Sequence, residues 1–242
     1  MRVTPLHQLL VRAACGPSEE ARNAWLRWCD EVDFDALDPV SERFVPLVVG
    51  RTGVVRPDDP LSGRARGLYR RAWAANEVLW HDVEPVLDAL GPHVLLGGSL
   101  VARQTRSRGR VRPLLHLDVV VPAPPPNGRS LVGAAGHLVQ VHVSHRAVVE
   151  DPCTSVLLLL DSPPEPEPIH VTDLHALLIA CPDPSALADR ARSWGLLGVT
   201  TTAVRQVHAL SNDARLTPLM HALRWRRRLF VGLRGRIMQH AS

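Results

Sequence analysis

Two stretches decide the fold of this chain: LLGGSL at residues 95–100 and RPLLHLDVVVP at residues 112–122. In the first, Gly97, Gly98 and Ser99 follow a short apolar run, as at a turn between a strand and a helix, where backbone amides can face a phosphate. The second is typical of a strand. Because residues two apart on a strand point to the same face, we expect His116 and Asp118 to lie side by side.

Further short apolar runs bounded by proline or glycine extend this pattern into a sheet. We expect strands at residues 94–96, 114–121, 138–143 and 156–160. Gln140 and His142 should share one face of the third strand. Apolar residues at helical spacing predict helices before residue 90 and after residue 169, including a long helix at 62–90 that Pro85 should kink or divide. The fold class is therefore α+β, with a small mixed sheet flanked by N-terminal and C-terminal helices.

The proline-rich stretch SPPEPEP at residues 162–168 is the best domain boundary, since such a sequence favours a stiff, polyproline-like linker. A second turn or connector is expected at APPPNG, residues 123–128. We divide the chain into a helical region at 1–90, an α/β core at 91–161 and a helical region at 169–242.

Composition excludes several classes of function. The 242 residues, 45% of them hydrophobic, can form an ordinary core, and a net charge of +4 is too small to indicate a nucleic-acid partner. No run approaches the ~20 apolar residues of a membrane span, and Arg12 interrupts the only stretch similar to a secretion signal. The chain has no lysine. We expect a cytoplasmic protein without a lysine nucleophile or a P-loop.

The four cysteines, Cys15, Cys29, Cys153 and Cys181, are far apart in the sequence. No two of them form a CxxC motif, which zinc knuckles and redox enzymes typically contain. We interpret them as buried thiols in a reducing compartment.

The turn and the strand resemble the polymerase-beta-like nucleotidyltransferase superfamily, in particular its uncharacterised branch with an Arg-Pro-x-x-Asp-x-Asp strand. The resemblance implies a sheet of the nucleotidyltransferase type. It also implies a catalytic role for Asp118, and nucleotide contacts from Gly97, Gly98, Ser99 and Arg112. Gly98 and Ser99 match the turn, Arg112 and Pro113 the start of the strand, Asp118 its second aspartate and His142 the histidine that follows the third carboxylate.

The chain also departs from this family pattern at two metal-binding positions. His116 stands where the family has its first aspartate, and Gln140 where it has its third carboxylate. Mg²⁺ prefers anionic oxygen ligands, so Asp118 alone should bind it weakly. A softer ion such as Zn²⁺ or Mn²⁺ could instead use His116, Asp118 and His142. The connection at residues 122–137 is short, and we expect it to lack the helix and hairpin of the family.

Three hypotheses about function follow. The first is a degenerate nucleotidyltransferase-fold protein that binds a nucleotide or a protein partner with weak or no nucleotidyl transfer. The second is an active metal-dependent enzyme that uses Asp118 with recruited carboxylates such as Glu150 or Asp151. The third is an accessory or scaffolding protein that acts through its helical faces or through the arginine-rich run at residues 223–236. Whether the chain is an enzyme is left open.

Overall fold

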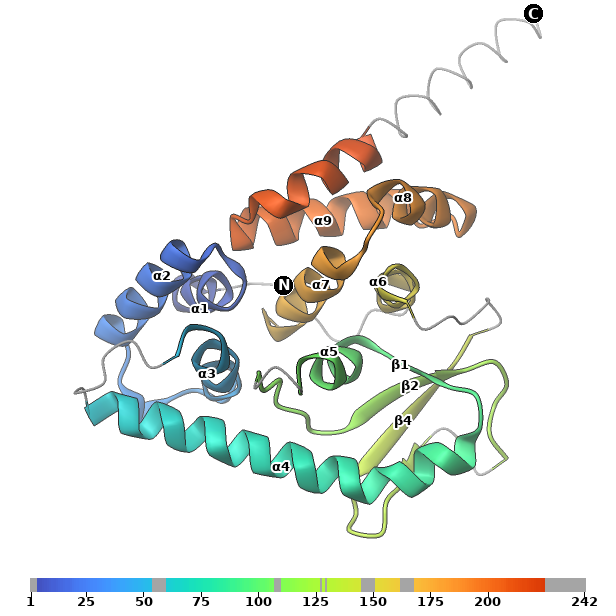
Figure 1. Cartoon of the computed structure of the whole chain (residues 1–242), viewed down its shortest axis with the longest axis horizontal. Helices are drawn as coiled ribbons and strands as arrows, with labels where there is room; N and C mark the ends of the chain where they lie inside the picture. The colour runs from blue at the N-terminus through green and yellow to red at the C-terminus, as the bar shows by residue number, and fades with distance from the viewer. Residues whose placement is uncertain are drawn as a thin grey trace, which may run out of the picture.

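A computed structural model describes residues 4–53, 60–106, 110–126, 128, 130–144, 151–161 and 168–224. In these residues, helices surround a small four-stranded sheet (Figure 1). The α+β class and the small mixed sheet are thereby confirmed.

The N-terminal region consists of four α-helices: α1 (Pro5–Cys15), α2 (Ser18–Glu31), α3 (Pro39–Thr52) and α4 (Pro60–Leu90). Local sequence explains where two of them begin. The side chains of Thr4 and Asp38 accept hydrogen bonds from backbone amides in the first turns of α1 and α3, and a proline follows each of them. A short 3-10 helix, η1 (Phe34–Ala36), separates α2 from α3.

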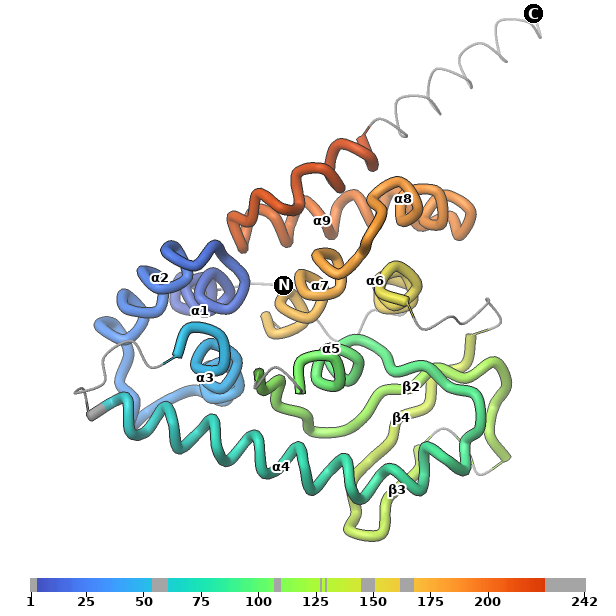
Figure 2. Tube along the Cα trace, in the orientation of Figure 1, coloured from blue at the N-terminus to red at the C-terminus, as the bar shows by residue number. Residues whose placement is uncertain are grey.

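Helix α4 is a continuous helix of 31 residues that contains Pro85. Of the two expected effects of Pro85, a kink or a division of the helix, the division is therefore wrong. Figure 2 shows that α4 runs along the whole length of one side of the molecule. It contacts α3 near its beginning and strands β3 and β4 of the sheet near its end, so it connects the helical region to the sheet.

The sheet contains β1 (Val94–Leu95), β2 (Leu117–Val121), β3 (Ser130–Val132) and β4 (Leu138–Val143), in the order β1-β2-β4-β3. Strands β2 and β4 are parallel, and the other two pairs are antiparallel. The connection at 122–137 contains β3, which forms a hairpin with β4, so the expected absence of a hairpin is wrong. Asp82 on α4 fixes this hairpin by accepting hydrogen bonds from the amides of Ala135 and His137.

The remaining helices are α5 (Gly97–Arg106), α6 (Pro152–Asp161), α7 (Pro168–Ala180), α8 (Pro184–Ser193) and α9 (Leu197–Ser211), followed by the 3-10 helix η2 (Ala214–Leu216). The predicted strand at 156–160 is wrong, because these residues belong to α6. Asp151 accepts a hydrogen bond from the Thr154 amide, Pro152 is the first helical residue, and leucine favours helix over strand. An apolar run alone cannot distinguish a buried strand from a buried helix.

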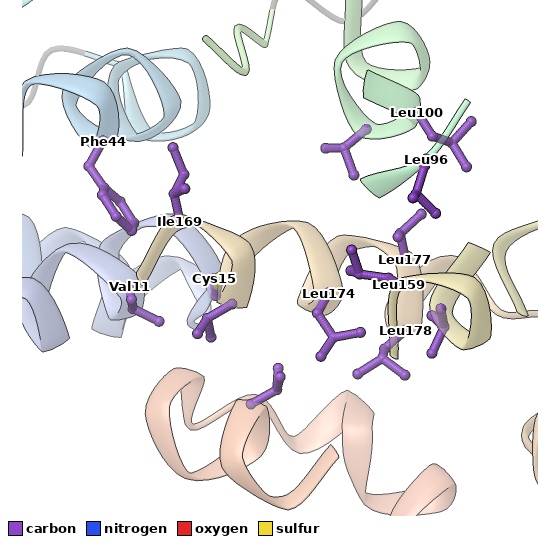
Figure 3. Close-up of a cluster of buried hydrophobic side chains, with 14 of the residues drawn as sticks. Val11, Cys15, Phe44, Leu96, Leu100, Leu159, Ile169, Leu174, Leu177 and Leu178 are labelled. Atoms are coloured by element: carbon purple, nitrogen blue, oxygen red, sulfur yellow. The ribbon is translucent and has the colours of Figure 1, made fainter. Parts of the chain in front are cut away.

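Helix α7 lies at the centre of the core. Figure 3 shows Ile169, Leu174 and Leu177 of α7 between side chains of α1, α3, α5 and α6. One continuous hydrophobic cluster thus contains residues from all three predicted regions. No helix in the described part of the chain is both long enough and apolar enough to cross a membrane. Residues 217–224 are helical, and the arginine-rich run beyond residue 224 lies outside the described residues.

Candidate functional site

A cavity of about 510 Å³ opens between the sheet, the start of α5 and helix α7. This volume is in the range of small-molecule binding sites. Its wall includes every residue that the sequence nominated for the site: Gly97, Gly98, Ser99, Arg112, His116, Asp118, Gln140 and His142. Residues from three segments of the sequence, 97–99, 112–118 and 140–142, therefore meet in one place.

The sheet accounts for part of this arrangement. In the parallel pair of β2 and β4, Asp118 lies opposite Gln140, so their side chains are on the same face. His142, two residues after Gln140, is on that face as well, and His116 precedes the first residue of β2. The predicted sharing of a face by Gln140 and His142 is confirmed, and the pairing of the strands adds Asp118 to that face.

The Gly-Gly-Ser turn is bound directly to strand β2. The Ser99 hydroxyl accepts a hydrogen bond of 2.9 Å from the Asp118 amide, and the Leu96 amide donates one of 2.9 Å to the Asp118 carbonyl. Gly97 has a φ of +51°, a conformation that favours glycine. The turn therefore fixes the backbone of Asp118 and places the first turn of α5 at the cavity wall.

Gly98 is required for a different reason. A Cβ atom at this position would lie 2.8 Å from Nη2 of Arg112 and 3.1 Å from Oδ2 of Asp173. The missing side chain thus leaves room for an ion pair between Arg112 and Asp173, which is packed against the helix backbone. This glycine has a structural function whether or not a ligand binds.

The Arg112–Asp173 ion pair is bidentate and buried. Nε and Nη2 of Arg112 donate hydrogen bonds of 2.7 Å each to the two carboxylate oxygens, and the side chains are only 5% and 1% exposed. Nη1 donates to the Pro113 carbonyl. Asn76 on α4 binds the same segment, since its amide donates to the Arg112 carbonyl and its oxygen accepts from the Leu114 amide. The guanidinium predicted to contact nucleotide is thus already bound by the protein.

Sequence reasoning missed Asp173, although the sequence holds one signal for it. Asp173 is the only charged residue of the Asp, Glu, Lys and Arg types in α7, whose sequence is PIHVTDLHALLIA. An isolated acid in an otherwise apolar helix indicates a buried carboxylate that needs a partner. The partner itself, 61 residues earlier in the chain, could not be identified without the fold.

The second charged group in the cavity is a His-Asp-His cluster: His116, Asp118 and His142. Nε2 of His116 lies 3.2 Å from Oδ2 of Asp118, and Nε2 of His142 lies 3.0 Å from Oδ1. About a third of each side chain is exposed, at 38%, 30% and 31%. Unlike the ion pair, this cluster is accessible to a ligand from solvent.

Burial raises the pKa of Asp118, but the hydrogen bonds from His116 and His142 outweigh it and lower the pKa to about 2. The hydrogen bond to Asp118 raises the pKa of His116 above its ordinary value of 6.5, against the effect of burial. Asp118 is therefore ionised at any physiological pH, and it favours the positively charged form of His116.

The ligands at this position do not fit a pair of Mg²⁺ ions. Of the two carboxylates that line the cavity, Asp173 is bound by Arg112, and both oxygens of Asp118 face imidazole nitrogens. Among the described residues, no group of three histidine, cysteine or acidic side chains has a geometry suited to a metal ion. The Zn²⁺ or Mn²⁺ site at His116, Asp118 and His142 stays a prediction.

The active-enzyme hypothesis names Asp151 and Glu150 as recruited carboxylates, and the structure describes only the first of them. Asp151 does not line the cavity; its carboxylate accepts hydrogen bonds from Thr154 and from Arg190 at 2.7 Å. Glu150 lies outside the described residues. No family model matches the sequence, and no curated protein or solved structure was found to match this chain. The function must therefore be argued from the cavity.

Proposed function

We propose that this protein binds a nucleotide, or a closely related phosphate ester, in the cavity at the start of α5, with weak or no nucleotidyl transfer. The observation that carries the proposal is the His-Asp-His cluster. In the resemblance, His116 stands at the family's first aspartate, Asp118 matches its second aspartate, and His142 matches the histidine that follows its third carboxylate. We therefore expect a ligand of the class that this family binds, a nucleotide, without the metal-dependent chemistry of the family.

The phosphate would bind between the start of α5 and the cluster. The N-terminal end of a helix attracts anions because its amides point outward and its dipole is positive there. The Ser99 amide already donates to the Leu96 carbonyl, and the Ser99 side chain is buried, with its hydroxyl accepting from the Asp118 amide. We therefore assign the backbone contacts to Gly97 and Gly98, and the charged contact to His116 in its protonated form.

Transfer should be weak because the transition state has no strong counter-charge. Two Mg²⁺ ions commonly neutralise the reacting phosphates and activate the attacking hydroxyl. Here a neutral amide, Gln140, lies opposite Asp118, which is partly exposed, whereas the other acid of the cavity wall, Asp173, is buried. An imidazolium can bind a phosphate, but it cannot activate a hydroxyl as a pair of metal ions does.

A thermal-shift titration with ATP, GTP, CTP and UTP, in EDTA and in Mg²⁺, tests the binding. A ligand at 100 times its Kd stabilises the native state by about 2.7 kcal/mol, which is measurable in a chain of this size. We expect a shift in EDTA that the double change His116→Ala with His142→Ala removes. The matched control is His221→Ala, an exposed histidine outside the cavity. The absence of a shift with any nucleotide would contradict the proposal.

The active-enzyme hypothesis is tested separately with nucleotides labelled at the α-phosphate. We expect little or no incorporation into protein or small acceptors by the wild type. Strong incorporation that requires Mg²⁺ or Mn²⁺ and disappears in Asp118→Ala would instead establish a working transferase. The two experiments separate binding from chemistry, because either result can occur without the other.

A further inference from the structure

Cys153 and Cys181 meet in the folded chain although they are 28 residues apart in sequence. Cys153 is the second residue of α6, and Cys181 directly follows the last residue of α7. Their sulfur atoms lie 3.0 Å apart, and both residues are free thiols. The sulfurs need to approach by about 1 Å to form a covalent bond. This contact was not predicted, because the two cysteines are far apart in the sequence and form no CxxC motif.

The surroundings distinguish the two thiols. Cys153 is at the N-terminal end of α6, where helix amides stabilise a thiolate. The hydrogen bond with Cys181 lowers the pKa of Cys153, against the effect of burial, and the same contact raises the pKa of Cys181. Among the nearby charges, Asp151 and Asp183 raise the pKa of Cys153, and Arg190, which binds Asp151, lowers it. Cys153 is thus the better nucleophile of the pair, and Cys181 is its proton-bearing neighbour.

We infer that Cys153 and Cys181 form a redox-active dithiol that a small hydroperoxide oxidises to a disulfide. The size of the oxidant follows from access: Cys153 is only 4% exposed, and Cys181 is partly exposed. A compact oxidant such as hydrogen peroxide can reach the buried sulfur more readily than a bulky disulfide. This inference goes beyond the proposed function and does not depend on it.

The reaction balances in two steps. The Cys153 thiolate attacks one oxygen of the peroxide; an S–O bond forms, the O–O bond breaks, and the departing hydroxide takes a proton to become water. The Cys181 thiol then attacks the sulfur of the resulting sulfenic acid and loses its proton; an S–S bond forms, and the hydroxyl leaves as a second water. The two thiols lose two electrons and the peroxide gains them. A dithiol reductant reverses the bond by exchange.

The disulfide would join the beginning of α6 to the end of α7. These two helices contribute Leu159, His170 and Asp173 to the cavity wall. A covalent link between them restricts their separation, so the oxidation state of the pair can affect the shape of the cavity at a distance from its ligand-binding residues.

Peroxide treatment followed by alkylation of the denatured chain tests the inference. The reduced protein has four thiols to alkylate. We expect an equimolar dose of hydrogen peroxide to remove two of them, Cys153 and Cys181, with recovery by dithiothreitol. Peptide mapping should find the Cys153 peptide linked to the Cys181 peptide, in the mass of the monomer. Thermal unfolding of the oxidised form should begin at a higher temperature, since the link restricts the unfolded chain.

Variants with one cysteine replaced by serine distinguish the roles of the two thiols. In Cys181→Ser, peroxide should leave Cys153 as a sulfenic acid that dimedone traps, and in Cys153→Ser, Cys181 should stay alkylatable. Cys29→Ser, which changes a cysteine outside the pair, should oxidise like the wild type. The inference would be overturned if Cys153 and Cys181 remained alkylatable at doses that oxidise Cys29, or if the disulfide joined two different chains.

Discussion

Two charged groups lie in the same cavity, the Arg112–Asp173 ion pair and the His-Asp-His cluster, yet solvent reaches only the second. The side chains of the ion pair are at most 5% exposed, whereas those of the cluster are 30–38% exposed. Arg112 and Asp118 stand six residues apart in one motif, and the resemblance implies a nucleotide contact for Arg112 and a catalytic and metal-binding role for Asp118. The comparison shows that one motif can supply a structural group and an accessible one.

The two groups differ in how many of their nitrogen atoms are already bound within the protein. Every nitrogen of the Arg112 guanidinium donates within the protein, to Asp173 or to the Pro113 carbonyl. The imidazoles of His116 and His142 each use one nitrogen on Asp118. A phosphate would have to break a buried ion pair to reach Arg112, but it can approach the cluster without doing so.

Removal of one partner from the ion pair should have the largest effect on stability. Asp173→Asn leaves the guanidinium of Arg112 buried without a counter-charge, which typically costs about 3–5 kcal/mol. Urea unfolding measures this loss. The control is Glu77→Gln, which removes the partner of Arg106 in an exposed pair and should cost about 1 kcal/mol or less. Equal losses in the two variants would contradict the structural role of Asp173.

Gly98→Ala should have the next largest effect, because the new Cβ atom would displace the ion pair. Overpacking of this kind costs about 1–3 kcal/mol. Gly63→Ala on α4 is the matched control; nothing lies within 4 Å of a Cβ atom there, and alanine in a helix should stabilise by about 0.5–1 kcal/mol. When Asp173→Asn is already present, Gly98→Ala should lower the free energy of unfolding by less than it does in the wild type, because the effects of substitutions at residues in contact do not add. If the two free-energy losses simply added, the glycine and the ion pair would contribute to stability independently.

A smaller, pH-dependent effect is expected for the cluster. The lowered pKa of Asp118 contributes stability above its unfolded value of 3.8, and this is lost as the pH falls toward about 2. The raised pKa of His116 contributes stability below its unfolded value of 6.5, and this is lost as the pH rises through the folded value. Asp118→Asn should therefore destabilise most between pH 3.8 and 6.5, by about 1–2 kcal/mol.

Urea unfolding of the wild type and Asp118→Asn across this range gives the difference at each pH. A difference that grows steadily from the acidic to the alkaline end would contradict the assignment of the hydrogen bonds to a protonated imidazole. His137→Asn is a useful control, because His137 pairs with Asp82 at the β3–β4 hairpin, outside the cavity.

The sequence was sufficient to place the residues that lie within one local pattern. Alternation along strands predicted that His116 lies beside Asp118 and that Gln140 and His142 share a face, and both are confirmed. Local patterns do not report which distant segments pack together. Asp173, from the core helix α7, and the contact of Cys153 with Cys181 depend on that packing. The error at 156–160 is of another kind, since a helix start at Asp151 was present but outweighed by the apolar run.

The central claim is that an imidazolium, and not a metal ion, receives the phosphate. Isothermal titration in EDTA, with the nucleotide that gives the largest thermal shift, tests it most directly at about pH 6 and about pH 8. We expect binding without metal that weakens as the pH rises through the raised pKa of His116, and no such dependence in His116→Ala with His142→Ala. Binding that requires Mg²⁺, or that does not weaken at any pH above that of the first titration, would contradict the claim.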